Sequence, residues 1–297
     1  MLFAQDTYRQ VGFFGEDKDK EVNMNKKIEK TQLHFIKHDA KVAPVITYSG
    51  HDELQEYSDA YAFQDADIID ARQVSEGTTF TLDSAGFALV SFSPNDVDYL
   101  DPQAVKANYY SEVEALIKAQ TGAMDVFAFD HTVRRGIAGS NRHPAYHVHN
   151  DYTHETGVSR AGSMLGEEVV KHFAGKRMVQ INVWRSISGV VERDPLAFMD
   201  RRTLDEQDLV KANIFFNDMK TGEKHQGEIF ALKQNPQQKW YFYSQMDAEE
   251  AIFIKGYDSD PSVASFAMHT AFPLSDQDEQ SKPRESIETR TYAFFDQ

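Results

Sequence analysis

The sequence contains no cysteine among its 297 residues. Disulfide bonds, thiolate nucleophiles and cysteine-ligated metal sites are therefore excluded, and histidine and carboxylate side chains would have to hold any bound metal ion. The N-terminus also lacks the basic region and the long apolar run of a signal peptide. We therefore expect a cytoplasmic protein, a location in which proteins seldom form disulfides.

Basic residues are few and long apolar runs are absent. The chain has 31 Lys and Arg against 47 Asp and Glu, a net charge of −16. This surplus repels phosphate backbones, so a nucleic acid partner is not expected. No run approaches the roughly 18 apolar residues that a membrane-spanning helix needs. We expect a small-molecule substrate as the partner, with a homo-oligomer left open.

The composition is that of a folded protein with one large domain. Apolar residues make up 41% of the chain and aromatic residues 12%, too many for general disorder. Gly15 to Lys30 is polar and lacks a regular pattern. We therefore expect a single domain over 1–297, with an N-terminal extension at 1–30 and a core over 31–297.

The elements predicted from periodicity are mostly strands in the second half of the chain. Asp101, Pro102 and Gly122 mark the ends of one helix, and a second helix is expected over Ala161–Phe173. No alternation of strands and helices indicates a parallel sheet, so we expect a mainly β fold with added helices (α+β), a jelly roll or a sandwich. The expected strands are Met178–Arg185, Ile214–Met219, Gly227–Leu232, Trp240–Met246, Ile252–Lys255, Ser265–Phe272 and Glu285–Phe295, the second and third forming a hairpin.

The densest group of chemically competent residues is the segment HVHNDY. On an extended strand His149 and Asp151 point to the same side. An imidazole and a carboxylate are two thirds of the facial triad that holds non-haem Fe(II) and leaves coordination positions open. Such a pair also occurs at ordinary solvated strand ends, so it needs support from the rest of the chain.

Support comes from the C-terminal half, which supplies the remaining parts of such a site in order. His269 lies in an expected strand and provides a third ligand. Arg284 follows, with Ser286 two residues on, and a 2-oxoglutarate enzyme needs such a cation for the far carboxylate of its cosubstrate. Arginine suits this task because its planar fork matches a carboxylate bidentately.

Several longer motifs resemble the gibberellin-desaturase/CmcJ/AsaB-like oxygenases. The resemblance covers residues 140–295, and its motifs are HVHNDYT, QINVWRSISGVVERDPLAFMD, KWYFYSQM, EEAIFIKGYDSD, MHTAF and RESIETR. It implies a double-stranded β-helix (jelly roll, cupin-like) fold. It also implies an Fe(II)- and 2-oxoglutarate-dependent dioxygenase of secondary metabolism that uses O2 and a ferryl oxidant to hydroxylate, desaturate or cyclise a small molecule.

The resemblance also implies roles for individual residues. Fe(II) is expected on His149, Asp151 and His269, and 2-oxoglutarate on Arg284 with help from Ser286. Arg290 competes with Arg284 for this role, because both fall on one face of the same expected strand. The candidate substrate contacts are Asn182, Trp184, Arg185, His147 and Tyr152, each of which could equally be structural.

Two other functions remain open at this point. His147, His149 and Asp151 begin like the motif of dinuclear metal-dependent hydrolases, although Tyr152 stands where that motif has its next ligand. A non-catalytic jelly-roll helper or binding protein is the other alternative.

Overall fold

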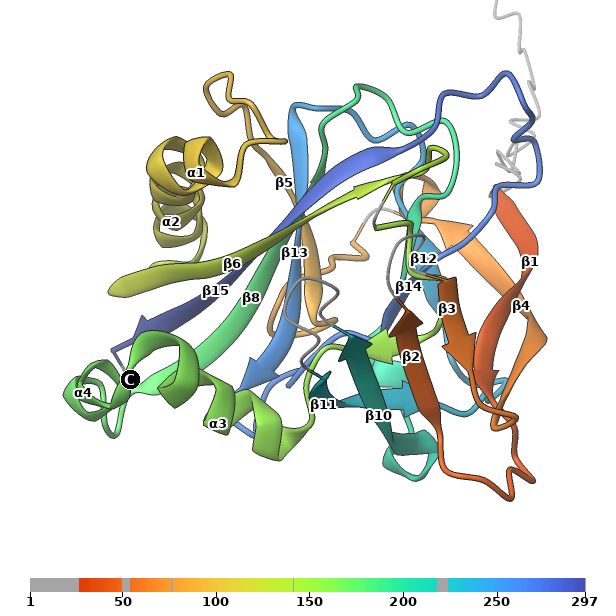
Figure 1. Ribbon diagram of the computed structural model, residues 1–297, viewed down its shortest axis with the longest axis horizontal. Coiled ribbons are helices and arrows are strands. Elements are labelled where there is room, and N and C mark those ends of the chain that lie inside the picture. The colour runs from red at the N-terminus through yellow and green to blue at the C-terminus, as the bar shows by residue number, and fades with distance from the viewer. Residues whose placement is uncertain (1–26, 50–53, 76, 141, 218–223, 297) are drawn as a thin grey trace, which may run out of the picture.

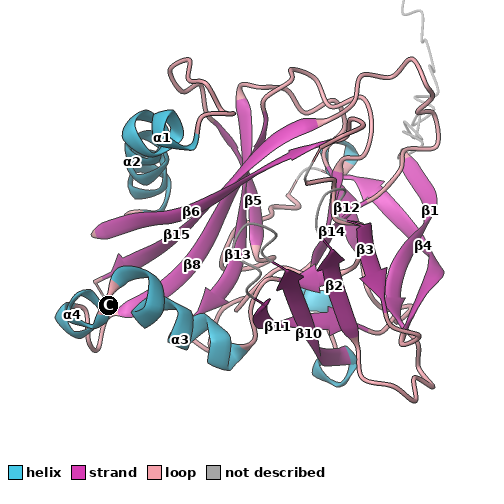
Figure 2. Ribbon diagram, viewed as in Figure 1, coloured by secondary structure: helices cyan, strands magenta, loops and turns pink. Residues whose placement is uncertain are grey.

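The computed structural model describes residues 27–49, 54–75, 77–140, 142–217 and 224–296, which form a mainly β structure of two sheets (Figure 1, Figure 2). One sheet has ten strands in the order β1-β4-β12-β9-β14-β7-β11-β10-β2-β3, and the other has five in the order β5-β13-β8-β15-β6. The predicted fold class, mainly β with added helices, is confirmed. Most of the predicted extension lies outside the described residues.

Eight strands of the C-terminal two thirds form the double-stranded β-helix that the motifs imply. In one sheet β6, β15, β8 and β13 pair in that order, and in the other β7, β14, β9 and β12 do, every pair being antiparallel. The chain moves between the sheets at nearly every step. The bounds are β6 Asp125–Arg135, β7 His149–Asn150, β8 Arg177–Ser186, β9 Leu196–Met199, β12 Trp240–Phe242, β13 Glu250–Asp258, β14 His269–Ala271 and β15 Glu285–Phe295.

The remaining strands extend the two sheets. The hairpin predicted near 214–232 is confirmed as β10 and β11, while Met219 and its turn lie outside the described residues. Five further strands come from the first half, where the sequence predicts none. These additions are β1 Ile28–Ile36, β2 Val45–Ser49, β3 Leu54–Tyr57, β4 Tyr61–Asp70, β5 Phe87–Ser91, β10 Leu209–Asn217 and β11 Lys224–Leu232.

The first predicted helix is confirmed and lies beside β6, outside the five-stranded sheet (Figure 1). It consists of α1 (Pro102–Ala104), a π-helical turn (Val105–Tyr109) and α2 (Tyr110–Thr121). The Asp101 carboxylate accepts a hydrogen bond from the Gln103 N–H, and Gly122 ends the helix with a φ of 74°. Elsewhere in the described residues, short 3-10 helices lie at Ala71–Gln73, Arg201–Thr203 and Glu206–Asp208.

The second predicted helix, Ala161–Phe173, is wrong in its bounds. Two helices occupy this region, α3 (His154–Leu165) and α4 (Glu167–His172). Gly166 separates them because its φ of 88° cannot continue a helix. The start lies earlier because Thr153 and Thr156 form a capping box, worth about 1 kcal/mol.

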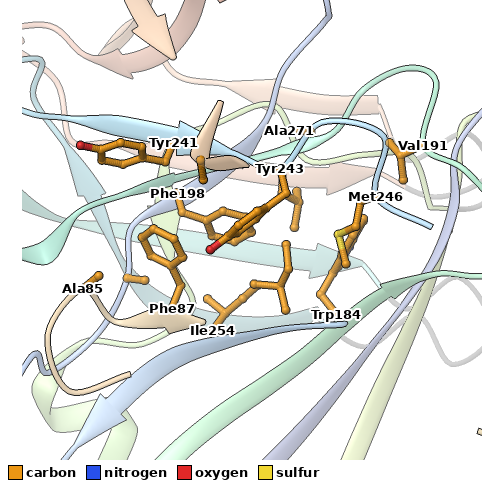
Figure 3. Packing of buried hydrophobic residues seen from close by; sticks show 14 residues of the cluster. Ala85, Phe87, Trp184, Val191, Phe198, Tyr241, Tyr243, Met246, Ile254 and Ala271 are labelled. Atoms are coloured by element: carbon orange, nitrogen blue, oxygen red, sulfur yellow. The ribbon is translucent and has the colours of Figure 1, made fainter. Parts of the chain in front are cut away.

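Strand β8 separates a hydrophobic core from the interior of the β-helix. Val179, Ile181 and Val183 pack in one cluster with α2 residues, whereas Trp184 joins a cluster shared by both sheets. Figure 3 shows Trp184 on the same side as Phe87, facing the residues of the other sheet. Since side chains alternate along a strand, Asn182 points into this same interior.

No helix in the described part of the chain is long and apolar enough to cross a membrane.

Candidate active site

Three potential metal ligands meet where β7 and β14 pair. His149 on β7 lies directly opposite His269 on β14 in the antiparallel register, and their ring centroids are 4.5 Å apart. Asp151 follows β7 immediately. One ligand atom from each of the three residues lies within 4.8 Å of the others. Two histidines and one carboxylate are the donor set of a facial triad, so these residues fit a non-haem iron.

Backbone carbonyls orient both imidazoles. His149 Nδ1 lies 2.8 Å from the His147 carbonyl oxygen, and His269 Nδ1 lies 3.0 Å from that of Ala267. Because carbonyls only accept hydrogen bonds, Nδ1 carries the proton and Nε2 presents its lone pair to the site. Burial lowers the pKa of His269 to about 4, so the ring is neutral at pH 7 and able to bind a metal.

The Asp151 carboxylate is held through one of its two oxygens. Oδ2 accepts hydrogen bonds from Asn182 Nδ2 at 2.9 Å and from Arg290 Nε at 3.3 Å. Oδ1 instead lies 3.5 Å from His149 Nε2. Burial raises the pKa of Asp151, but the charge of Arg290 lowers it, and the pKa lies well below its ordinary value. The carboxylate is therefore ionised, with one oxygen available on the histidine side.

Arg290 is surrounded by carboxylates. Its guanidinium contacts Asp151, Asp130 at 3.2 Å and Glu288 at 2.7 Å, and it donates to Thr132 at 2.9 Å. Burial lowers the pKa of Arg290, but the three carboxylates raise it well above its ordinary value. The donors of Arg290 are thus engaged within the protein.

Arg284 is in the opposite situation. It is 1% exposed, its guanidinium lies 5.5 Å from the Trp184 ring, and Nη1 donates to the Asp194 carbonyl. Nε and Nη2 are buried and have no hydrogen-bond partner among the residues that the structure describes. These two nitrogens form the side-on edge that binds a carboxylate bidentately. Burial lowers the pKa of Arg284 to about 10, which leaves it charged at neutral pH. This buried, unused fork fits the far carboxylate of 2-oxoglutarate.

Strand β15 brings the candidate anion-binding residues to one face. Ser286, Glu288 and Arg290 lie opposite Ser186, Trp184 and Asn182 of β8 in the register. Ser286 is 1% exposed. Arg284 lies just before the strand and continues this alternation. Its free fork therefore faces the same interior in which Arg290 contacts Asp151.

Arg185, a candidate substrate contact, lies on the other face of β8. Its guanidinium donates to the Tyr99 hydroxyl at 2.7 Å and to the Ala248 carbonyl, and it lies 5.7 Å from the Phe92 ring. Because neighbouring residues of a strand point to opposite faces, this arginine is turned away from Asp151. The structure therefore does not bring it to the site.

The other candidate substrate contacts lie around the three ligands but are engaged in packing. His147 is buried, stacks on His149 with centroids 4.3 Å apart and has Nδ1 3.2 Å from the Tyr57 hydroxyl. Within the described residues it is not in the ligand cluster, so a second metal site of the hydrolase kind is not formed. Tyr152 is 6% exposed and lies beside Gly256. Trp184 lies against Arg284.

Sequence reasoning missed Glu288 and Asp194 as parts of the site. Glu288 is buried, accepts from Asn182 Nδ2 at 3.3 Å, and has a pKa raised by burial. The alternation along the strand, which places Glu288 on the same face as Arg290, could have identified it. Asp194 carried no comparable signal, because its contact with Arg284 is made by a backbone carbonyl.

A cavity of about 1090 Å³ is lined by neighbours of these residues and not by the three potential ligands themselves. Its wall includes Asp194, whose carbonyl binds Arg284, and Tyr57, whose hydroxyl contacts His147. It also includes Ala271, two residues beyond His269 on β14. The remaining lining residues are Thr31, Gln32, His34, Phe63, Gly139, His143, Pro144, Tyr146, Arg193, Pro273 and Gln277.

Comparison with known proteins finds relatives over most of the chain. A family model described as "Oxidoreductase/YMDC permease-like domain" (YDMC) matches residues 33–294. The hydroxylase/desaturase efuI of Hormonema carpetanum is 31% identical over 240 residues, which span 73% of this chain and 79% of efuI. The Fe(II)/2-oxoglutarate-dependent dioxygenase nvfI of Aspergillus novofumigatus is 31% identical over 226 residues, spanning 73% of this chain and 78% of nvfI.

A solved structure matches as well. The iron and alpha-ketoglutarate-dependent endoperoxidase NvfI superimposes with a TM-score of 0.74 at 25% sequence identity, covering 91% of this chain and 99% of that one.

Proposed function

The chain belongs to the family of Fe(II)/2-oxoglutarate-dependent hydroxylases and desaturases, and we propose that it oxidises a C–H bond of a small biosynthetic molecule at the site described above. This membership confirms the resemblance to gibberellin desaturases and their relatives. The chain is accordingly a non-haem iron, 2-oxoglutarate-dependent dioxygenase. The observation that carries its active site is the pairing of a two-histidine, one-carboxylate cluster with a buried arginine fork left free.

In this proposal Nε2 of His149 and of His269 and Oδ1 of Asp151 hold the iron. When bound, the iron and 2-oxoglutarate supply an oxidant made from O2 that breaks a C–H bond and leaves hydroxylated or desaturated product, succinate and CO2. Asn182 and Arg290 keep Oδ2 of Asp151 occupied, so that this carboxylate offers the metal a single oxygen.

We assign the far carboxylate of 2-oxoglutarate to Arg284 and not to Arg290. The support is that Nε and Nη2 of Arg284 have no partner in the described part of the chain, whereas three carboxylates surround Arg290. Ser286, buried two residues on in the same strand row, would add a hydroxyl donor. Trp184 covers the guanidinium and helps exclude water, which strengthens the pairing of charges.

The cavity beside the site is the proposed substrate pocket. Its volume slightly exceeds the roughly 300–1,000 Å³ of small-molecule pockets. His34 and Phe63 stack in its wall with centroids 4.5 Å apart, and Tyr57 lies at the edge of the His34 ring. Such a wall favours an uncharged molecule with apolar rings. That the chain forms a homo-oligomer and acts in the cytoplasm stays a prediction.

The test of the function is succinate formation. Purified protein should release succinate from 2-oxoglutarate only with Fe(II) and O2, faster when an accepted substrate is present, and Asp151→Ala should abolish the release. Absence of succinate across a broad panel of apolar ring compounds, with metal and cosubstrate bound, would favour a binding protein instead.

The two arginines are separated by a second measurement. Arg284→Lys keeps the charge but not the fork, so it should raise the Kd for 2-oxoglutarate about tenfold or more and leave Fe(II) binding unchanged. Arg290→Met should mainly weaken Fe(II) binding, because it removes one of the two donors that hold Oδ2 of Asp151. The reverse pattern would reassign the cosubstrate to Arg290.

A further inference from the structure

Asp194 occupies an unusual backbone conformation between the cavity and Arg284. Its φ of 53° lies in the left-handed region, although it is not glycine and Pro195 follows it. A non-glycine residue in this region costs of the order of 1 kcal/mol or more and persists only where its surroundings hold it. Asp194 is 4% exposed and lines the cavity.

The side chain and the backbone N–H of Asp194 together hold this backbone in place. Gln277 bonds it twice, accepting from the Asp194 N–H at 3.1 Å and donating to Oδ1 at 3.1 Å. Gln277 is itself fixed by the Leu274 N–H at 2.9 Å. Arg193 Nε donates to the second carboxylate oxygen at 3.3 Å. The carboxylate therefore fastens its own strained main chain to the segment after β14.

The strained conformation aims the Asp194 carbonyl at Arg284. Within the described residues this carbonyl is the one hydrogen-bond acceptor of the guanidinium. The Trp184 ring restricts the guanidinium from one side but gives it no direction within its own plane. The carbonyl on Nη1 thus decides where the free edge formed by Nε and Nη2 points.

We propose that Asp194 is a positioning residue, which orients the Arg284 fork for the far carboxylate of 2-oxoglutarate through its strained backbone. The inference rests on the proposed function. It predicts that loosening Asp194 weakens the recognition of that carboxylate while the iron ligands keep their places. It also gives Gln277 a function, since the amide holds the carboxylate from the cavity side.

The test compares two variants of Asp194 that lose different hydrogen bonds of its side chain. Asp194→Gly tolerates the positive φ and removes both carboxylate bonds, leaving the backbone N–H bond to Gln277. Asp194→Asn tolerates it too and keeps one acceptor oxygen, which can serve Gln277 or Arg193. Calorimetric titration of the anaerobic Fe(II)-loaded protein should give Asp194→Gly a Kd for 2-oxoglutarate about 5- to 30-fold higher, as expected for one or two lost hydrogen bonds. Asp194→Asn should restore it to within about threefold of wild type.

Pyruvate separates positioning from general damage, because it is a 2-oxo acid without the far carboxylate. Its Kd should be unchanged in Asp194→Gly, as should the affinity for Fe(II) measured by competition with a chelator. Equal weakening of pyruvate and 2-oxoglutarate, or no weakening of either, would overturn the inference. If Asp194→Gly does not fold, Gln277→Ala tests the same tether and should raise the Kd for 2-oxoglutarate alone.

The outcomes for this inference and for the proposed function are distinct. Wild-type protein that binds no 2-oxoglutarate in the presence of Fe(II) refutes the proposed function and the inference with it. Wild-type binding that Asp194→Gly leaves intact refutes the inference alone.

Discussion

A buried charge network at one end of β13 offers a quantitative test of the fold. Lys255 is fully buried, and its Nζ lies 2.5 Å from Asp258 and 2.9 Å from Asp83. Arg177 donates to both oxygens of Asp258, at 3.0 and 2.6 Å, and also contacts Asp83. Two cations and two carboxylates thus neutralise one another, Asp83 being the exposed member.

The two central residues should differ in the cost of their replacement. After Lys255→Met, Asp258 keeps both bonds to Arg177, so we expect a loss of about 1.5–3 kcal/mol, the range for hydrogen bonds to charged groups. After Asp258→Asn, the buried Lys255 ammonium retains only the half-exposed Asp83 carboxylate. A loss of about 3–5 kcal/mol is expected there, because a buried charge is left poorly compensated.

Urea unfolding at pH 7 measures both losses, with an unchanged m-value as the sign that the denatured state is unaffected. The double variant should lose at least about 1 kcal/mol less than the sum of the single variants, since neither charge is then left alone. Lys171→Met, which breaks an exposed pair with Glu168, is the control and should stay within about 0.5 kcal/mol of wild type. If Lys255→Met proved as costly as Asp258→Asn, or neither differed from the control, the reasoning would be refuted.

Three further predictions concern other parts of the protein. Burial lowers the pKa of His34 to about 4. The neutral form of His34 therefore contributes stability that is complete above pH 6.5 and is lost as the pH falls toward 4. Relative to His34→Gln, urea unfolding of wild type should show a loss of about 2.5 kcal/mol between pH 7 and 4.5. Asn182→Ala removes the 2.9 Å bond to Asp151 and should weaken Fe(II) binding about 10- to 100-fold in chelator competition. Gly157→Ala places a methyl group 2.5 Å from the Tyr257 ring and should cost about 1–3 kcal/mol of stability, whereas an unchanged melting temperature would show that the ring moves freely.

The iron-binding part of the site was predictable because its residues are close in sequence or lie in well-marked strands. His149 and Asp151 need only an extended backbone to share a side. That His269 would join His149 and Asp151 followed from the motif resemblance, and the register places it opposite His149. β15 has the bounds that its alternation predicts.

The choice between Arg284 and Arg290 could not be made from the sequence. Arg290 lies on β15 and Arg284 lies just before it in the same alternation, so spacing treats them alike. What separates them is long-range packing, which brings Asp130 and Asp151 to one and the Asp194 carbonyl to the other.

The N-terminal strands were missed for a different physical reason. β4 has the sequence YAFQDADIID, in which short polar residues weaken the period of two, and it gains its stability by pairing with β1 and β12. Conversely, β12 and β14 are shorter than their apolar runs predict. The chain turns after β12, where Ser244 bonds to Asp70 and Gln245 has a φ of 47°.

The most direct test of the central claim is an anaerobic titration followed in the visible range. Adding Fe(II) and then 2-oxoglutarate to the protein should produce a weak charge-transfer absorption band that saturates at one equivalent of each, and Asp151→Ala should not produce it. No band in wild type, or an unchanged band in Asp151→Ala, would contradict the assignment of His149, Asp151 and His269 as the iron site.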